Sequence, residues 1–132
     1  MICGTGIDLL DIDRMRKTLS KSDNAFIERV FTDEEIAYCR GGVSLSARSR
    51  CFAGRFCAKE AFLKALGTGL RDGIWWKDIE VMNDALGKPT VTLKNMASEI
   101  LKEKHITHVH VSISHDRKTA AAVVVLERLS DG

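Results

Sequence analysis

The segment that most constrains the fold runs from Cys51 to Gly69 and reads CFAGRFCAKEAFLKALGTG. At 100° per residue, large and small side chains of this segment separate onto two roughly opposite faces of a helix. The large face carries Phe52, Phe56, Leu63 and Leu66, and the small face carries Gly54, Cys57, Ala58, Ala61 and Ala65. Because small side chains allow another backbone or a ligand to come close, we expect a helix that is buried on two faces.

Three charged residues interrupt this helix. Glu60 and Lys64 lie one turn apart on the border between the faces, and Lys59 falls within the large face. Burying an unpaired charge is costly, so these side chains need partners. One interpretation is an i,i+4 ion pair between Glu60 and Lys64, worth about 0.2–0.5 kcal/mol, with Lys59 extending to solvent. The other is a functional site beside the helix, and this segment alone leaves both open.

Length and composition favour one soluble domain over residues 1–132. The net charge of +2, without a dense Lys/Arg run, gives no support for a nucleic-acid partner. No apolar run reaches the ~18 residues of a membrane span, and the N-terminus lacks the basic leader of a signal peptide. We therefore expect a cytoplasmic protein with neither nucleic acid nor membrane as partner.

The cysteine pattern indicates reduced thiols rather than a disulfide framework. No C-x-x-C spacing occurs among the four, which lie in apolar or small-residue surroundings: Cys3, Cys39, Cys51 and Cys57. Such cysteines are typical of reduced, mostly buried thiols in a cytosolic protein.

Strand and helix patterns alternate irregularly along the chain. Strands are expected at residues 2–10, 75–82, 90–93, 108–114 and 119–126, with turns at 21–24, 83–89 and 116–118. Helices are expected at about 11–19, 25–30, 33–40, 51–67 and 95–103, with 43–50 leading into the long one. Thr32 and Glu35 have the spacing of a capping box. Without regular βαβ spacing, this order predicts an α+β fold with a mostly antiparallel sheet packed against helices.

Several polar residues lie where packing alone would not select them, which points to a functional site. Asp8 interrupts an apolar strand, although taken alone a strand-end or N-cap carboxylate is the simpler interpretation. The Gly67-Thr68-Gly69 triplet follows the long helix and fits either a C-cap or a phosphate nest. Two carboxylates from separate elements can hold Mg²⁺ together with substrate phosphates, and a nearby lysine can neutralise a phosphoryl group. These parts describe a pyrophosphate-handling site, provided that they converge in space.

The histidines offer a rival interpretation as a transition-metal site. His108 and His110 share one face of a strand, and His105 is near them in sequence. No cysteine or carboxylate with suitable spacing completes a ligand set, so we reject zinc.

Longer motifs then identify a family. They are GIDLLDIDR at 6–14, FTDEE at 31–35, FAGRFCAKEAFLKALGTG at 52–69, DIEV at 78–81, GKP at 87–89, and HVSISHD at 110–116 followed by AAAVVVLE. In this order and spacing, nearly the whole chain resembles the holo-acyl-carrier-protein synthases, the small bacterial type of 4′-phosphopantetheinyl transferase.

The resemblance implies transfer of the phosphopantetheine arm of coenzyme A to a serine of an apo acyl carrier protein, in fatty acid biosynthesis. The other product is adenosine 3′,5′-bisphosphate. It also implies that Asp8 and Glu60 bind Mg²⁺ and that Lys64 offsets charge on the pyrophosphate or assists the leaving group. The coenzyme pocket would be lined by Arg55, Lys59, Lys64, Gly67, Thr68 and His115. The base that takes the serine proton stays open between Asp8, Glu60 and a metal-bound water.

The same resemblance implies a carrier-docking role for Arg14 and a homotrimer with active sites at the subunit interfaces. Two positions depart from the wider pattern. Leu10 stands where larger relatives often have a further metal-binding acid, and Cys57 stands where alanine is common. We expect Cys57 to be inert.

Two other functions compete with the transferase. A non-catalytic module that binds a carrier protein or nucleotide is disfavoured by the intact Asp8, Glu60 and Lys64. A nucleic-acid binder has little support from the charge.

Overall fold

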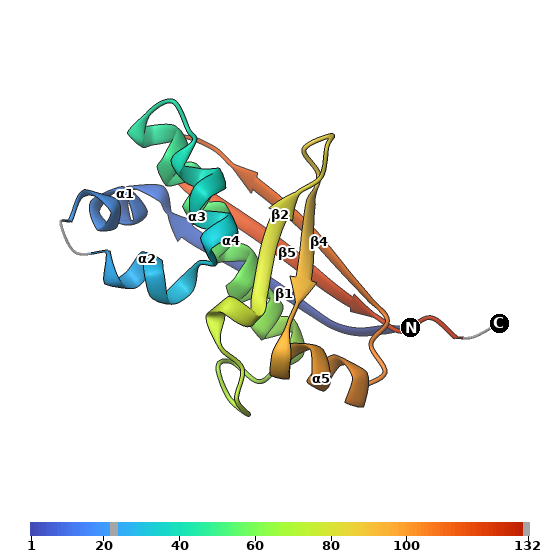
Figure 1. Ribbon diagram of the computed structural model, residues 1–132. Coiled ribbons are helices and arrows are strands. Elements are labelled where there is room, and N and C mark those ends of the chain that lie inside the picture. The colour runs from blue at the N-terminus through green and yellow to red at the C-terminus, as the bar shows by residue number, and fades with distance from the viewer. Residues whose placement is uncertain (22–23, 131–132) are drawn as a thin grey trace.

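A computed structural model of the protein describes residues 1–21 and 24–130 (Figure 1). Its elements follow in the order β1 (Ile2–Asp11), α1 (Ile12–Ser20), α2 (Ala25–Val30), α3 (Asp33–Arg40), α4 (Leu45–Leu66), η1 (Trp76–Asp78), β2 (Ile79–Asn83), β3 (Pro89–Leu93), α5 (Asn95–Glu103), β4 (His108–His115) and β5 (Thr119–Glu127). One antiparallel sheet has the order β1-β5-β4, and β2 and β3 form a separate antiparallel hairpin. The expected α+β class with antiparallel sheets is confirmed.

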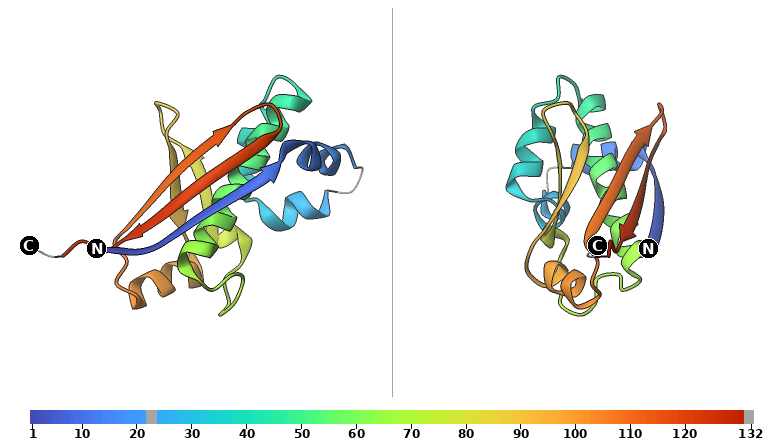
Figure 2. Two further views of the ribbon diagram at one scale, coloured as in Figure 1. Left: turned by 180° about the vertical axis from the view of Figure 1, so that it is seen from behind. Right: turned by 90° about the vertical axis from the view of Figure 1, so that its right-hand side faces the viewer.

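The long helix α4 lies at the centre of the molecule. Figure 2 shows it between the three-stranded sheet and the layer formed by α3 and the β2–β3 hairpin. Its bulky side chains Phe52, Phe62 and Leu63 are buried, and so are its small residues, such as Ala58 and Ala61. The prediction that this helix is buried on two faces is therefore correct.

The small face of α4 touches the backbone of the sheet. Gly6 of β1 packs against the Ala61 carbonyl, and Gly4 packs against Ala65, so closely that a Cβ at either glycine would collide with a carbonyl oxygen. At the other end of the crossing, Gly54 of α4 packs on Ile113 of β4. The helix thus crosses the sheet from β4 to β1, with its C-terminal half on β1.

Several predicted boundaries need correction. The helix α4 begins at Leu45 with Ser44 as its N-cap, not at Cys51, because the Ser side chain accepts a hydrogen bond from the Ala47 N–H. Residues 76–78 form a 3₁₀ turn, and β2 begins only at Ile79. The predicted turn at 21–24 includes residues 22–23, which lie outside the described part of the chain.

The expectation of reduced cysteines is wrong for two of the four. Cys39 and Cys51 form a disulfide, because α3 and α4 pack together and bring their Cα atoms to 5.4 Å. A separation of 12 residues gives no spacing signal in the sequence. Cys3 is exposed and Cys57 is buried, both as free thiols.

Within the described ranges, no helix has the length and apolar character needed to cross a membrane. The cytoplasmic location stays a prediction.

Candidate active site

Asp8, Glu60 and Lys64 come together where β1 meets α4. Because side chains alternate along a strand, Asp8 points to the same side as Gly4 and Gly6, which is the side covered by α4. The Lys64 ammonium group donates to Asp8 Oδ1 at 3.0 Å and to the Ile7 carbonyl at 3.0 Å. The lysine is thus paired with a carboxylate from another element. The convergence required for a shared site is present.

Within this group, the Glu60 carboxyl has a raised pKa. Partial burial raises the pKa of its carboxyl, the charge of Asp8 raises it further, and Lys64 lowers it. Two carboxylates that repel each other favour a cation between them. Among the described residues, no group of three or more His, Cys, Asp and Glu side chains could hold a metal. As a pair of carboxylates, Asp8 and Glu60 suit a hard cation that would take its remaining ligands from phosphate and water.

Cys57 lies behind this group, with its Sγ 3.6 Å from the Ala120 carbonyl. Burial raises the pKa of the thiol to about 12, and the charge of Asp8 contributes in the same direction. Because the thiolate is the reactive form, this environment supports the expectation that Cys57 is inert.

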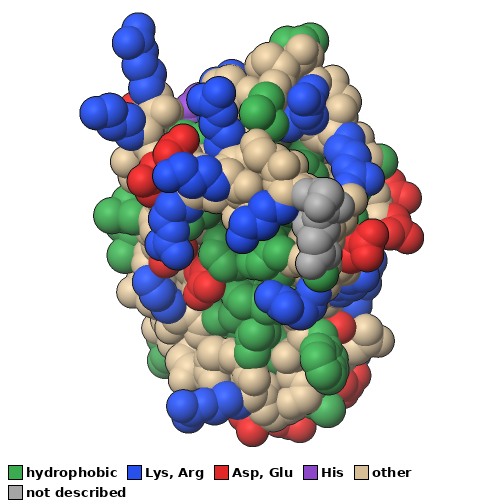
Figure 3. Space-filling model, turned by 90° about the vertical axis from the view of Figure 1, so that its left-hand side faces the viewer, with side chains coloured by type: hydrophobic (Ala, Val, Ile, Leu, Met, Phe, Trp, Pro, Cys, Tyr) green, Lys and Arg blue, Asp and Glu red, His purple; other side chains and the backbone are tan. Residues whose placement is uncertain are grey.

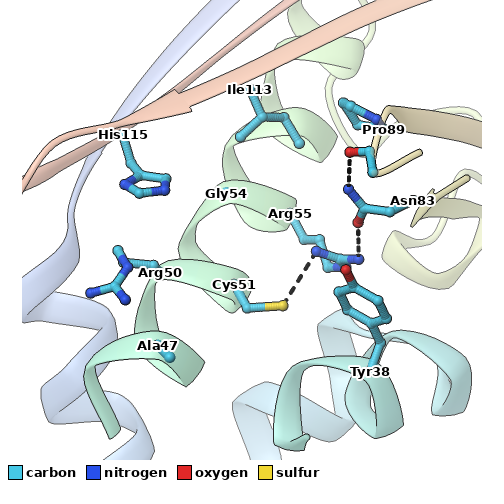
Figure 4. Close-up of a pocket in the computed structure, with 11 residues that line it drawn as sticks. Tyr38, Ala47, Arg50, Cys51, Gly54, Arg55, Asn83, Pro89, Ile113 and His115 are labelled. Carbon is cyan, nitrogen blue, oxygen red and sulfur yellow. Dashed lines mark hydrogen bonds between the residues drawn. The ribbon is translucent and has the colours of Figure 1, made fainter. Parts of the chain in front are cut away.

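A second candidate region is a cavity of about 330 Å³ on the other flank of α4 (Figure 4). It is lined by α3, α4, the β2–β3 hairpin and β4, and its polar side chains are Tyr38, Arg50, Arg55, Asn83 and His115. The predicted residues Arg55 and His115 therefore share one cavity. Tyr38, Arg50 and Asn83 were missed because no local pattern marks residues from three separate elements.

Arg55 is held by three neighbours in this cavity. One terminal nitrogen donates to Asn83 Oδ1 at 2.7 Å and the other to Cys51 Sγ at 3.3 Å. The guanidinium carbon lies 4.5 Å from the centre of the Tyr38 ring, within the range of a cation–π contact. Its buried Nε has no hydrogen-bond partner among the described residues. The guanidinium is thus fixed at a cavity wall.

The cavity and the acidic group lie at opposite edges of the sheet. The cavity includes Ile113 and His115 of β4, whereas Asp8 belongs to β1, and β5 runs between these two strands. The helix α4 separates the two regions, with Gly54 facing the cavity and Glu60 near Asp8.

Lys59 does not join either region. Its side chain is fully buried, and its ammonium group donates to Glu35 Oε1 at 2.7 Å, the Val30 carbonyl at 2.8 Å and the Trp76 carbonyl at 3.2 Å. Burial lowers the pKa of this lysine, and the charge of Glu35 opposes that shift. The interpretation in which Lys59 extends to solvent is wrong, and the position of this lysine gives no support to a role in coenzyme binding. It ties α4 to α2, α3 and η1.

Replacing Lys59 with methionine is expected to lower the free energy of unfolding by about 3–5 kcal/mol, because Glu35 would remain buried without its counter-charge. Urea denaturation measures the change. The double variant Lys59→Met/Glu35→Gln removes both charges of the pair and should recover part of the loss. A loss below about 1 kcal/mol in the single variant would contradict a structural role for the pair.

Gly67 and Thr68 follow α4 as a C-cap. Gly67 has a φ of 82°, and its N–H donates to the Leu63 carbonyl at 2.9 Å. A left-handed residue at this position is favourable for glycine. The Thr68 hydroxyl donates to the Gly69 carbonyl. The capping role is thus evident, and coenzyme contacts for these two residues stay a prediction.

Arg14 lies on the exposed side of α1, whose buried residues are Ile12 and Met15. Figure 3 views the molecule from the side on which α1 and α2 lie, and it shows Lys and Arg side chains around a hydrophobic area. Such a surface suits a partner that is acidic and partly apolar.

Comparison with known proteins identifies the family. The model of the 4′-phosphopantetheinyl transferase superfamily matches residues 4–124. The chain belongs to this superfamily. A transferase relative from Syntrophus aciditrophicus, named holo-[acyl-carrier-protein] synthase, is 52% identical over 131 residues, covering 99% of this chain and 100% of the relative.

Solved structures of transferases agree with this assignment. The holo-[acyl-carrier-protein] synthase of Neisseria meningitidis is 36% identical, with a TM-score of 0.87 over 97% of this chain and 100% of that one. The synthase of Bacillus anthracis, solved in complex with CoA (3′,5′-ADP), is 39% identical, with a TM-score of 0.80 over 98% and 99% of the two chains.

Proposed function

We propose that this protein transfers the 4′-phosphopantetheine arm of coenzyme A to a serine of apo acyl carrier protein in fatty acid biosynthesis. Adenosine 3′,5′-bisphosphate is the second product, and residues 1–132 act as one transferase domain. The observation that carries the proposal is the convergence of Asp8 with Glu60 and Lys64, in a chain whose full-length relatives have the name of this activity.

In the proposed reaction, the serine hydroxyl attacks the phosphorus atom that bears the pantetheine arm and gives its proton to a base, for which Asp8, Glu60 and a water are the candidates. The bond from this phosphorus to the oxygen of the departing nucleotide breaks. Asp8 and Glu60 would hold Mg²⁺, which when bound supplies positive charge to the pyrophosphate oxygens. Lys64, with its side chain 55% exposed, can move its ammonium group from Asp8 to the departing phosphate and offset the developing charge.

The coenzyme would also contact the cavity that holds Arg55. Arg50, Arg55 and His115 provide cationic or hydrogen-bonding groups suited to phosphate. This cavity lies at the β4 edge, whereas the acidic group lies at the β1 edge of the same protomer. A coenzyme that contacts both regions is best accommodated between two protomers. One protomer would contribute its acidic group at the β1 edge, and the other would contribute its cavity at the β4 edge.

This argument supports the proposal of a homotrimer with interfacial active sites. A head-to-tail contact between different edges closes into a ring when the rotation allows it. The outer face of the sheet is apolar and open in the single chain, with Ile7 63%, Leu9 65% and Val123 39% exposed. Burying such a face would stabilise an oligomer. Sedimentation equilibrium tests the trimer, and a monomer at micromolar concentration would count against it.

The direct test of the transferase combines the purified protein, coenzyme A, Mg²⁺ and an apo carrier protein. Mass spectrometry should find the carrier heavier by one phosphopantetheine. If folded protein with metal gives no mass gain on any of several apo carriers, the proposed function is wrong.

Replacing Arg14 with alanine is expected to raise the KM for the carrier protein about threefold to tenfold, with little change in coenzyme A affinity, because rim charges steer and orient an acidic partner. Steady-state kinetics against carrier concentration and calorimetry with coenzyme A separate the two effects. Lys102→Ala, at an exposed position on α5, is the matched control. Equal losses for carrier and coenzyme would contradict the docking role.

A further inference from the structure

The Cys39–Cys51 disulfide lies at the wall of the cavity that holds Arg55. It joins the last turn of α3 to the first half of α4. Cys39 is buried with 1% exposure, whereas Cys51 is partly exposed and lines the cavity. The Cys51 side of the disulfide therefore borders the cavity, and the Cys39 side is shielded by the core.

The disulfide is coupled to the position of the Arg55 side chain. Figure 4 shows Cys51 and Tyr38 next to the guanidinium group. Cys51 Sγ accepts a hydrogen bond from Arg55, and Tyr38, whose ring lies 4.5 Å from the guanidinium carbon, immediately precedes Cys39. The Tyr38 contact thus depends on the distance that the disulfide fixes between α3 and α4. Cys51 lies one turn before Arg55 on α4, and the disulfide fixes the direction of its sulfur.

The disulfide also closes the segment between the two helices. This segment contains the Gly41-Gly42 pair and the N-cap Ser44, and it leads to Ala47 and Arg50 at the cavity wall. A cross-link restricts the conformations of the loop that it closes. Breaking it would let the end of α3 and the start of α4 separate at the glycines, so the cavity would be less preorganised for a ligand.

We propose that Cys39 and Cys51 are a reversible redox modification site that sets the affinity of this cavity for the nucleotide part of its ligand. The proposal rests on the proposed function for its assignment of the cavity to the coenzyme. A disulfide in a reducing compartment is typically transient and redox-sensing, which fits the predicted cytoplasmic location. The bonded state holds Arg55 against Tyr38 and favours binding.

The chemistry is thiol–disulfide exchange with a dithiol reductant. A reagent thiolate attacks Cys51 Sγ, the bond to Cys39 breaks, and Cys39 leaves with the electron pair and takes a proton. The second thiol of the reagent then attacks the mixed disulfide, closes a cyclic disulfide and releases Cys51 as a thiol. The protein gains two electrons and two protons, and the dithiol loses them. Oxidised dithiol reverses the reaction.

Calorimetry with adenosine 3′,5′-bisphosphate tests the proposal, since this probe has no thiol that could exchange with the protein. Wild-type protein equilibrated with oxidised dithiol should bind the probe at least about fivefold more tightly than protein reduced by dithiothreitol. Alkylation of free thiols and mass spectrometry report the bonded state in each sample, and circular dichroism reports that the reduced protein is folded.

Two variants complete the test. Cys39→Ser keeps the pocket-lining Cys51 and should bind weakly under both conditions. Cys3→Ser, at an exposed free thiol on β1, should keep the full redox response. Equal affinity of oxidised and reduced wild type would overturn the proposal, as would failure of the pair to form a disulfide while transferase activity is normal. Absence of probe binding in both states, with the disulfide formed, would instead overturn the assignment of the cavity to the coenzyme, and the proposed control of its affinity with it.

Discussion

Replacing Glu60 with glutamine is expected to reduce turnover by at least about a hundredfold while the protein stays folded. The carboxylate lies with Asp8 at the junction of β1 and α4, and an amide of nearly the same shape cannot supply its charge to a metal ion. Burial and the charge of Asp8 both raise the pKa of Glu60, so its ionised form is less favourable in the native state than in the unfolded chain. Removing that charge should leave the melting temperature unchanged or slightly higher.

The two effects are measured separately, by mass-spectrometric turnover of an apo carrier and by thermal unfolding. Glu99→Gln is the matched control, because Glu99 is an exposed helical glutamate that pairs with Lys102 on α5. It should retain full activity. Near-normal turnover of Glu60→Gln would remove this residue from the metal site, and a large fall in melting temperature would show that its role is structural.

The spacing of apolar and small residues predicted those contacts that depend on a single helix face or a single strand. The small residues of α4 indicated a close approach, and the structure places Ala61 and Ala65 against Gly6 and Gly4. Residue type likewise pointed to Asp8 and Glu60, because a carboxylate in an apolar segment requires a partner. Their convergence depends on the packing of β1 on α4, which no local pattern specifies.

Contacts between distant residues were not predictable in this way. Glu35 had the spacing of a capping residue, and in the structure its carboxylate accepts a hydrogen bond from the Thr32 N–H. The same carboxylate also pairs with Lys59 and accepts a hydrogen bond from the Val81 N–H. Only the first of these contacts is local. The Cys39–Cys51 bond was missed because the two residues meet through the packing of α3 on α4. The start of α4 was predicted too late because the apolar pattern is weak before Cys51.

Replacing Gly6 with alanine is expected to lower the free energy of unfolding by about 4 kcal/mol or more, or to prevent folding. The added Cβ would collide with the Ala61 carbonyl oxygen and lie 2.7 Å from the Ala65 nitrogen. Both are backbone atoms of a buried helix, so no side chain can move aside. Ordinary overpacking costs about 1–3 kcal/mol, and a contact between two backbones allows less relaxation.

Urea denaturation of Gly6→Ala and of Thr5→Ala separates this contact from general effects on the strand. Thr5 is the preceding residue, is exposed and points to the opposite face of the sheet, so its substitution should change stability by about 0.5 kcal/mol or less. Because Asp8 lies two residues beyond Gly6 on the same face, a displacement of β1 would also widen the 3.0 Å contact between Asp8 and Lys64. Any folded fraction of Gly6→Ala should therefore lose turnover. Similar midpoints for the two variants, with normal turnover in both, would show that β1 can move away from α4 without disturbing the acidic group.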